Sequence, residues 1–205
     1  MRNISLLVIA LFLISGVLAD AQSPQDEILD TRVAVAQYGR QLSSSDAITR
    51  QTAAEALAKL AAVDQKKLVE SYVLQEKDKR VRLALNWALY RMGKSQTLYE
   101  IVRDLDSSRH DQAANYLTLL EGPGPLYIFL KQDHTRFKVK IRVIEVLGRI
   151  GNFETLEQIK PFNDAFEHQL VEAAQASTKQ IQERLAQPQP TNKTRPRVVT
   201  KREQP

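Results

Sequence analysis

The sequence contains no cysteine, and this absence excludes three kinds of feature at once. A chain without thiols cannot form disulfides, bind a metal through thiolates or carry a lipoprotein anchor. Glycine is also scarce, with seven in 205 residues. Valine and isoleucine recur at helical rather than alternating intervals, which together with the scarce glycine favours a mostly helical protein.

Arrangements that support catalysis or metal binding are missing as well. The three histidines, His110, His134 and His168, include no pair at i and i+4, so they give no sign of converging metal ligands. The serines at 43–45 lack a Gly-x-Ser-x-Gly context, and the turn at 122–125 lacks the Lys and Ser/Thr of a phosphate-binding loop. The sequence therefore predicts a protein that is not an enzyme and that needs no metal or cofactor.

Positive charge is present but unevenly placed. The formal net charge is +5, and the segment from Gln187 onward, rich in proline and poor in apolar residues, accounts for +4 of it. Such a composition is typical of an unfolded tail. The rest of the chain is close to neutral, which argues against a basic nucleic-acid-binding surface. The tail cations are Lys193, Arg195, Arg197, Lys201 and Arg202.

The basic tail has two interpretations. It is either a dispensable terminus or an electrostatic tether to anionic lipid, lipopolysaccharide, cell-wall polymer or an acidic protein. Cations near an anionic membrane contribute on the order of 1 kcal/mol each, so the tether would be weak and sensitive to salt.

The first residues have the pattern of a secretory signal peptide. A short basic start precedes an apolar run at 4–19, and Ala19-Asp20-Ala21 supplies the small residues of a cleavage site after Ala21. The alternative is an uncleaved membrane anchor, for which a run of 16 residues is short, since spanning helices need about 20. We expect a periplasmic or secreted protein with no integral membrane span after cleavage.

The body of the chain is built from a repeated unit. Residues 81–93 and 139–151 each carry a branched residue, a cation, apolar positions at helical spacing, and then Arg, an apolar residue and Gly. Four copies align on Leu60, Met92, Leu120 and Ile150. Two further apolar columns precede these anchors: Leu57, Leu89, Leu117 and Leu147, and Ala53, Leu85, Ala113 and Val143. A period of this length predicts stacked antiparallel helix pairs, because one pair cannot bury its own apolar face.

Four segments follow from this pattern. Residues 1–21 are the signal peptide, and 22–45 hold an N-terminal helix with five residues available to pack: Ile28, Leu29, Val33, Ala36 and Tyr38. Residues 46–186 form the repeat domain, which closes in a long capping helix at 164–186 with Phe166 among its apolar residues. Residues 187–205 are the disordered basic tail. The predicted fold class is all-α.

Two of the copies resemble HEAT repeats, in particular the short HEAT-like repeats of the phycobilisome-lyase type. The matching residues are Asp78, Val81, Arg82, Ala84, Ala88, Leu89, Met92, Gly93 and Leu98 in one copy, and Val139, Lys140, Val146, Leu147, Gly148, Ile150, Gly151 and Leu156 in the other. The resemblance implies a right-handed α-solenoid. Such repeats serve as scaffolds, binding platforms and lyase subunits, so the resemblance does not specify a function. A bilin-lyase role is disfavoured because that partner set is cytoplasmic.

One polar column and one aromatic group are the candidate partner-binding residues. Ten residues before each anchor stand Arg50, Arg82, His110 and Lys140, which are either a basic ladder that grips an acidic partner or cations that cap and bridge neighbouring repeats. Trp87 and Tyr90 lie opposite the main apolar stripe of their helix. They are either core residues between repeats or an exposed aromatic anchor.

These observations predict an exported scaffold or adaptor for protein–protein interaction, with a protein partner of unknown identity. The alternative is a peripheral envelope-binding protein attached by its tail to an anionic surface. The candidate partner-binding residues are Arg50, Arg82, Trp87, Tyr90 and Lys140.

Overall fold

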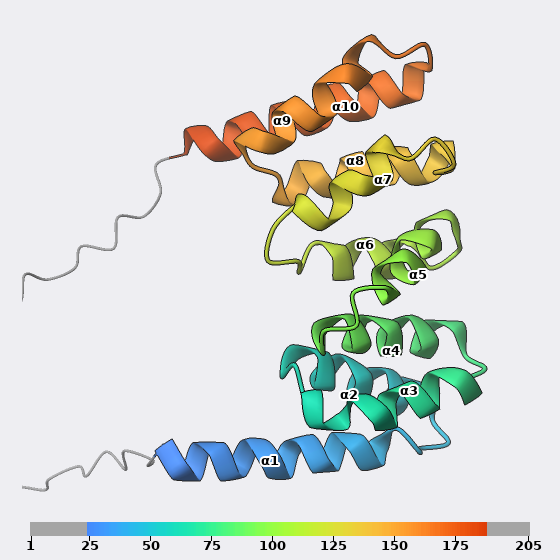
Figure 1. The fold of residues 1–205 in the computed structure, drawn as a ribbon, viewed down its shortest axis with the longest axis vertical. Helices are drawn as coiled ribbons and strands as arrows, with labels where there is room; N and C mark the ends of the chain where they lie inside the picture. The colour runs from blue at the N-terminus through green and yellow to red at the C-terminus, as the bar shows by residue number, and fades with distance from the viewer. Residues whose placement is uncertain (1–23, 188–205) are drawn as a thin grey trace, which may run out of the picture.

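The computed structural model describes residues 24–187 and shows an all-helical protein. Within that range there are ten α-helices and no strand. The helices are stacked in layers along the longest axis, from α1 at one end to α10 at the other (Figure 1). The expected signal peptide and the basic tail lie outside the described residues. None of the described helices is long and apolar enough to cross a membrane.

The helices fall into pairs, each with a first and a second member, between two longer terminal helices. The terminal helices are α1 (Pro24–Gln41) and α10 (His168–Ala186). The first helices are α2 (Ala47–Lys59), α4 (Lys79–Arg91), α6 (His110–Leu117) and α8 (Phe137–Ile150). The second helices are α3 (Lys66–Gln75), α5 (Thr97–Arg103), α7 (Tyr127–Lys131) and α9 (Phe153–Ile159). Short 3-10 helices at Val63–Gln65, Asp104–Asp106, Gly124–Leu126 and Lys160–Asp164 adjoin α3, α5, α7 and α9.

Polar side chains set where several helices begin. Asp46 accepts hydrogen bonds from the backbone N–H groups of Ile48 and Thr49 at the start of α2, and Asp78 does the same at the start of α4. At α9, Asn152 and Thr155 bond reciprocally to each other's backbone in a capping box. These bonds satisfy amide groups that have no partner inside the helix.

Cations mark the opposite ends. A basic residue in the last turn interacts favourably with the partial negative charge of the helix C-terminus. Most of the helices follow this rule, with Arg40, Lys59, Arg91, Arg103, Lys131, Arg149 and Arg184 in last turns.

The turn after a first helix requires a left-handed residue in two of the copies. Gly93 has φ of 86°, and its neighbour Lys94 donates a backbone hydrogen bond to the Leu89 carbonyl at 2.9 Å. The same turn after α2 places Ala61 at φ of 45°, with Ala62 donating to the Leu57 carbonyl. A left-handed conformation is strained for alanine and free for glycine.

The core follows the predicted columns closely. The column of Leu57, Leu89, Leu117 and Leu147 and the column of Ala53, Leu85, Ala113 and Val143 are buried throughout. The anchor column is less regular, since Leu60 is 40% exposed. Packing is most extensive between α2 and α4 and between α8 and α10, whereas the short α6 contacts its neighbours α4 and α8 over a smaller length.

Two expectations about apolar residues are wrong. Ile28, Leu29 and Val33 do not pack, and more than half of each side chain's surface is exposed. The packed residues of α1 are Val35, Tyr38 and Leu42 in and after its second half. Phe166 is fully exposed because α10 begins only at His168, so Phe166 lies before the helix rather than on its apolar face.

Candidate functional site

Arg50 and Arg82 converge on one residue, Glu76, which directly follows α3. Arg50 donates to both carboxylate oxygens of Glu76, from Nε at 2.8 Å and from Nη2 at 2.9 Å. Arg82 donates from Nε to the Glu76 backbone carbonyl at 3.1 Å. The Glu76 carboxylate is 6% exposed, and its hydrogen bonds with Arg50 hold the pKa of Glu76 below its usual value. We call Arg50, Glu76 and Arg82 the inter-helix joint.

The joint also fixes the loop before α2. Arg50 donates from Nη1 to the carbonyls of Ser44 and Ser45, at 2.9 Å and 3.0 Å. The bonds of Arg50 and Arg82 therefore link three neighbouring helices within the protein. These contacts match the interpretation in which the cations bridge neighbouring repeats, and they occupy the groups that a partner would bind.

The other two cations of the column do not extend this arrangement. His110 Nδ1 lies 3.0 Å from the Ser107 carbonyl, and Lys140 is half-buried in the first turn of α8. The column is therefore not one continuous exposed ladder. Its members occupy equivalent helix positions but have different surroundings.

Trp87 belongs to the core. It is 4% exposed and stacks between Tyr90 and Tyr116, with both ring-centroid distances at 5.7 Å. The guanidinium of Arg91 lies 6.0 Å from the Trp87 ring centroid. Tyr90 is half-buried, and burial raises its pKa. An exposed Trp87 anchor is therefore wrong, because its ring is already covered within the protein.

A polar chain across α2 and α6 borders this aromatic stack. Tyr116 Oη donates to Glu55 Oε1 at 2.5 Å and accepts from Gln112 Nε2 at 2.8 Å. Burial, with the nearby Glu55 carboxylate, raises the pKa of Tyr116 far above its ordinary value. The phenol therefore stays protonated and serves as a hydrogen-bond donor.

A groove between α5, α7 and the start of α8 has the features of a binding site. Its volume is about 310 Å³. Val102, Phe129 and Val139 form a buried apolar floor, at 2%, 4% and 5% exposure. Tyr99, 47% exposed, stands beside it with its ring edge-on to Phe129 at a centroid distance of 5.0 Å. A concave apolar surface with an aromatic wall and a few polar groups is the usual form of a ligand site. We call this the α5–α7 groove.

Charged side chains surround the α5–α7 groove. Arg103 and Arg136 are 72% and 76% exposed. Arg136 Nη1 donates to Asp106 Oδ2 at 2.9 Å, which holds the pKa of Asp106 below its usual value, and Arg103 donates to Glu100. The exposed histidine His134 also lines the groove. Arg103 can bind an anionic group at little cost, because its pair with Glu100 is exposed and such pairs contribute at most about 1 kcal/mol.

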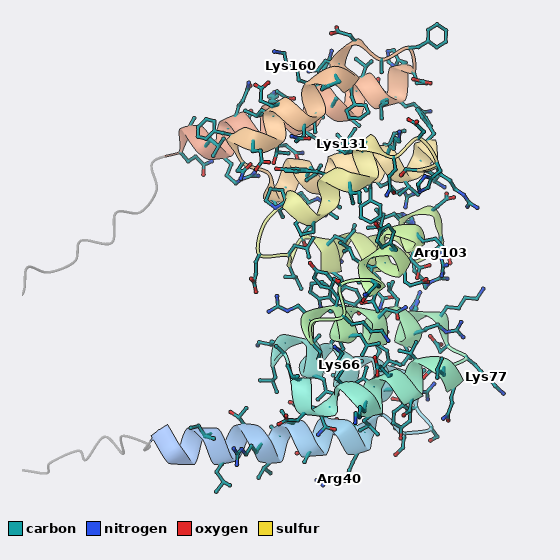
Figure 2. All side chains as sticks on the ribbon, viewed as in Figure 1. Arg40, Lys66, Lys77, Arg103, Lys131 and Lys160 are labelled. Carbon is teal, nitrogen blue, oxygen red and sulfur yellow. The ribbon has the colours of Figure 1, made fainter. Side chains whose placement is uncertain are left out.

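Exposed cations recur at the ends of the second helices. Each of the second helices ends in, or is followed by, an exposed basic residue (Figure 2). These residues are Lys77, Arg103, Lys131 and Lys160, and the view shows them in successive layers. Of these four residues, Arg103 also lines the α5–α7 groove.

The tail cations Lys193, Arg195, Arg197, Lys201 and Arg202 lie outside the described residues. Residues 24–187 contain no cluster of three or more His, Asp or Glu side chains that could hold a metal ion.

The groove was missed by reasoning from sequence. Tyr99 and Phe129 lie in different helices, and Val139 stands out in the sequence only as part of the HEAT-like pattern. One signal was present: both second helices carry an aromatic residue close to a terminal cation, Tyr99 with Arg103 and Phe129 with Lys131.

Comparison with known proteins gives no family. No family model matches the chain, and no curated protein matches it. Among solved structures, the crystal structure of an engineered protein aligns with 77% of this chain and 82% of its own, at 18% identity and a TM-score of 0.33.

Proposed function

We propose that the protein is an exported adaptor, built as a right-handed HEAT-like α-solenoid, that binds a protein partner through the α5–α7 groove. The solenoid is supported by the four-copy periodicity of the sequence and by the layered order of the helix pairs. The HEAT resemblance of residues 78–98 and 139–156 supports the same arrangement. An open stack of this kind offers an extended surface for partner binding.

The α5–α7 groove is the observation that carries this proposal. Its buried floor of Val102, Phe129 and Val139 accepts an apolar side chain, and its two exposed arginines select an acidic neighbour. Tyrosine and arginine are among the residues that contribute most of the binding energy at protein interfaces. The partner segment therefore combines an apolar anchor with one or more carboxylates.

Site-specific photocrosslinking tests the adaptor function. A photoreactive phenylalanine analogue replaces Tyr99 in the groove or Leu119, an exposed residue outside it, in cells that express the protein. We expect a discrete crosslinked protein from position 99 and none of the same mass from position 119. The partner, once purified, should bind the native protein at least about tenfold more tightly than the Arg103→Glu variant. Equal crosslinking at both positions, or equal affinity, would refute the proposal.

A second candidate function rests on the basic tail. Five cations and one acid in residues 187–205 could hold the protein on an anionic envelope surface. Cosedimentation with vesicles that contain anionic lipid should then fall when salt is raised, and should be lost on deletion of 187–205. Vesicle binding that survives the deletion would exclude the tail as a tether.

A further inference from the structure

Phe166 is the most exposed large apolar side chain among the residues that the structure describes, at 100%. It lies in the connection between α9 and α10, two residues before α10 begins. Exposed carboxylates flank it, because Asp164 comes two residues earlier and Glu167 directly after. Glu167 stands at the N-cap position of α10, and its side chain makes no capping hydrogen bond. Phe166 is therefore presented to solvent between two acids. We call residues 164–167 the Phe166 loop.

The basic residues that adjoin the Phe166 loop in the chain do not cancel its charge. Lys160 is six residues before Phe166. His168 follows the loop directly, but its Nδ1 lies 3.3 Å from Glu172 Oε1, so a proton on His168 would be offset by that carboxylate. Single exposed apolar residues are common on protein surfaces. The Phe166 loop is distinguished from them by its two acids and by a groove of complementary chemistry elsewhere on the same chain.

That groove is the α5–α7 groove. Its floor is apolar, and its volume of about 310 Å³ has room for an aromatic side chain. Tyr99 and Phe129 already form an edge-on pair there at a centroid distance of 5.0 Å, and a third ring gains from the same kind of contact. The two segments that form the groove, 99–106 and 129–142, hold six cations and four acids, a net charge of +2 with histidine neutral.

The acids that line the groove are already paired. Arg103 donates to Glu100, and Arg136 Nη1 donates to Asp106 Oδ2 at 2.9 Å. A second cation is close to Asp106, since Lys138 Nζ lies 3.8 Å from its Oδ1. Positive charge therefore remains in excess beside the groove, where it attracts an incoming carboxylate.

The groove and the Phe166 loop lie at the same edge of the stack. Each second helix runs back along a first helix, so the connections that follow the second helices are all at one end of the helices (Figure 1). The connection at 132–136, which borders the groove, and the connection at 160–167 are both at this edge, in successive layers. A twofold axis that crosses the edge midway between these two connections exchanges their positions.

We propose that two copies of the chain form a twofold-symmetric dimer in which Phe166 of each copy occupies the α5–α7 groove of the other. The inference rests on this groove as the protein-binding site of the proposed function and names an occupant for it. Asp164 and Glu167 then lie near Arg103 and the cations around Asp106 of the other copy. A reciprocal contact closes after two chains, as in the commonest protein assemblies. Because the dimer fills both grooves, an external partner competes with it.

The size of the contact predicts its strength. Each copy contributes one short loop and one groove, which together bury less than the roughly 1,600 Å² of a standard interface. We expect a monomer–dimer equilibrium with a dissociation constant on the order of 10 µM rather than a permanent dimer. Raised salt should weaken it, because the charges that attract each other are at the surface.

Sedimentation equilibrium of the full chain as isolated, its N-terminus established by mass spectrometry, tests the dimer. Phe166→Ala removes the anchor and Tyr99→Glu places a carboxylate in the groove, so each should weaken dimerisation at least about tenfold. Phe166 is fully exposed and Tyr99 is 47% exposed, so both variants should fold, which their melting temperatures check. Phe153→Ala is the matched control. Phe153 is 72% exposed at the start of α9, the opposite end of that helix, and its replacement should leave the equilibrium unchanged.

A mixture of the two variants distinguishes this contact from any other. A dimer of either variant alone lacks both contacts, since Phe166→Ala has no anchor and Tyr99→Glu has no apolar groove to receive one. A mixed dimer keeps one contact, in which Phe166 of the Tyr99→Glu copy enters the intact groove of the Phe166→Ala copy. An equal mixture should therefore dimerise more than either variant alone and less than the native protein.

Three results would overturn the proposal. The native protein could remain monomeric at a concentration about tenfold above the expected dissociation constant. It could form a dimer that neither variant weakens, as it would if the apolar run at 4–19 holds the copies together. The mixture could dimerise no better than either variant alone.

Failure of the adaptor function would be visible separately. In cells, crosslinking from position 99 gives a product of twice the monomer mass when a second copy fills the groove, and a product of another mass when an external partner does. The dimer alone would support this inference and refute the adaptor function. An external partner, together with a purified protein that stays monomeric, would do the reverse.

Discussion

Replacement of Glu76 by alanine is expected to destabilise the protein more than any exposed ion pair can account for. The carboxylate accepts two hydrogen bonds from Arg50 and a third from the backbone N–H of Asp78 at 2.8 Å. Its removal leaves Arg50, whose side chain is 17% exposed, without a counter-charge. Breaking a fully buried pair costs about 3–5 kcal/mol. Arg50 keeps some contact with water and two carbonyl partners, so we expect a loss of about 2–3 kcal/mol.

The assay is thermal or urea unfolding, with Glu121→Ala as the control. A loss of this size should lower the melting temperature by roughly 5–10 °C. Glu121 also pairs with an arginine, Arg91, but its side chain is 88% exposed, and removing it should cost less than about 1 kcal/mol. A double-mutant cycle with Arg50→Ala isolates the contribution of the pair. Equal effects of Glu76→Ala and Glu121→Ala would refute the reasoning.

The same pair predicts a dependence on pH. Because the pKa of Glu76 is lowered in the folded protein, its stabilising effect is present above the unfolded value of about 4.5 and is lost as pH falls through the folded value. The difference in unfolding free energy between the native protein and Glu76→Ala should therefore be constant near neutral pH and should shrink in acid. A difference that persists at low pH would show that charge is not its source.

Three further predictions concern turns and the aromatic stack. Gly151→Ala should lower the free energy of unfolding by about 1–3 kcal/mol, since its Cβ would lie 2.5 Å from the Leu147 carbonyl oxygen and 2.8 Å from Ile181. Gly122→Ala is the control and should have little effect, because the space around Gly122 is open. Equal melting temperatures of the two variants would contradict this prediction. Ala61→Gly should raise the unfolding free energy by about 0.5–1 kcal/mol by relieving the left-handed strain, and a loss of stability in denaturant titration would refute it. Tyr116→Phe should cost about 1–2 kcal/mol at neutral pH because Glu55 and Gln112 lose a partner. Since the pKa of Tyr116 is raised, the native protein should also lose stability above about pH 10 more steeply than Tyr116→Phe, as followed by unfolding at several pH values.

The helical core could be predicted because it depends on local periodicity. The Leu57 and Ala53 columns repeat in every copy, and a residue at such a position must be buried whichever neighbour covers it. The second helices follow from the same pattern, because each copy is predicted to be a pair of helices. Whether a residue in such a column is buried can therefore be predicted from the repeat pattern of the sequence.

Some residues have surroundings that depend on where a helix ends and on how far it is shifted relative to its neighbours. The surroundings of these residues could not be predicted in the same way. Gly93 and Gly151 occupy the same column, yet Gly93 is needed for its positive φ, whereas Gly151 has an ordinary φ and is needed for space against Ile181. Ile28 and Leu29 have the spacing of packed residues, but α1 extends past the helices that would cover them. Trp87 and Tyr99 show the same limit, because sequence spacing does not reveal which aromatic ring is covered by a neighbouring repeat.

The uneven lengths of the first helices have a mechanical consequence. α6 has 8 residues, while α4 and α8 have 13 and 14, so the stack is narrowest at its middle layer. A body with two well-packed blocks joined by a thin layer bends most easily at that layer. The α5–α7 groove takes its floor from both sides of the α6 layer, with Val102 before α6 in the chain and Val139 after it. If the proposed partner segment fills the groove, it contacts both blocks and should reduce bending at the α6 layer.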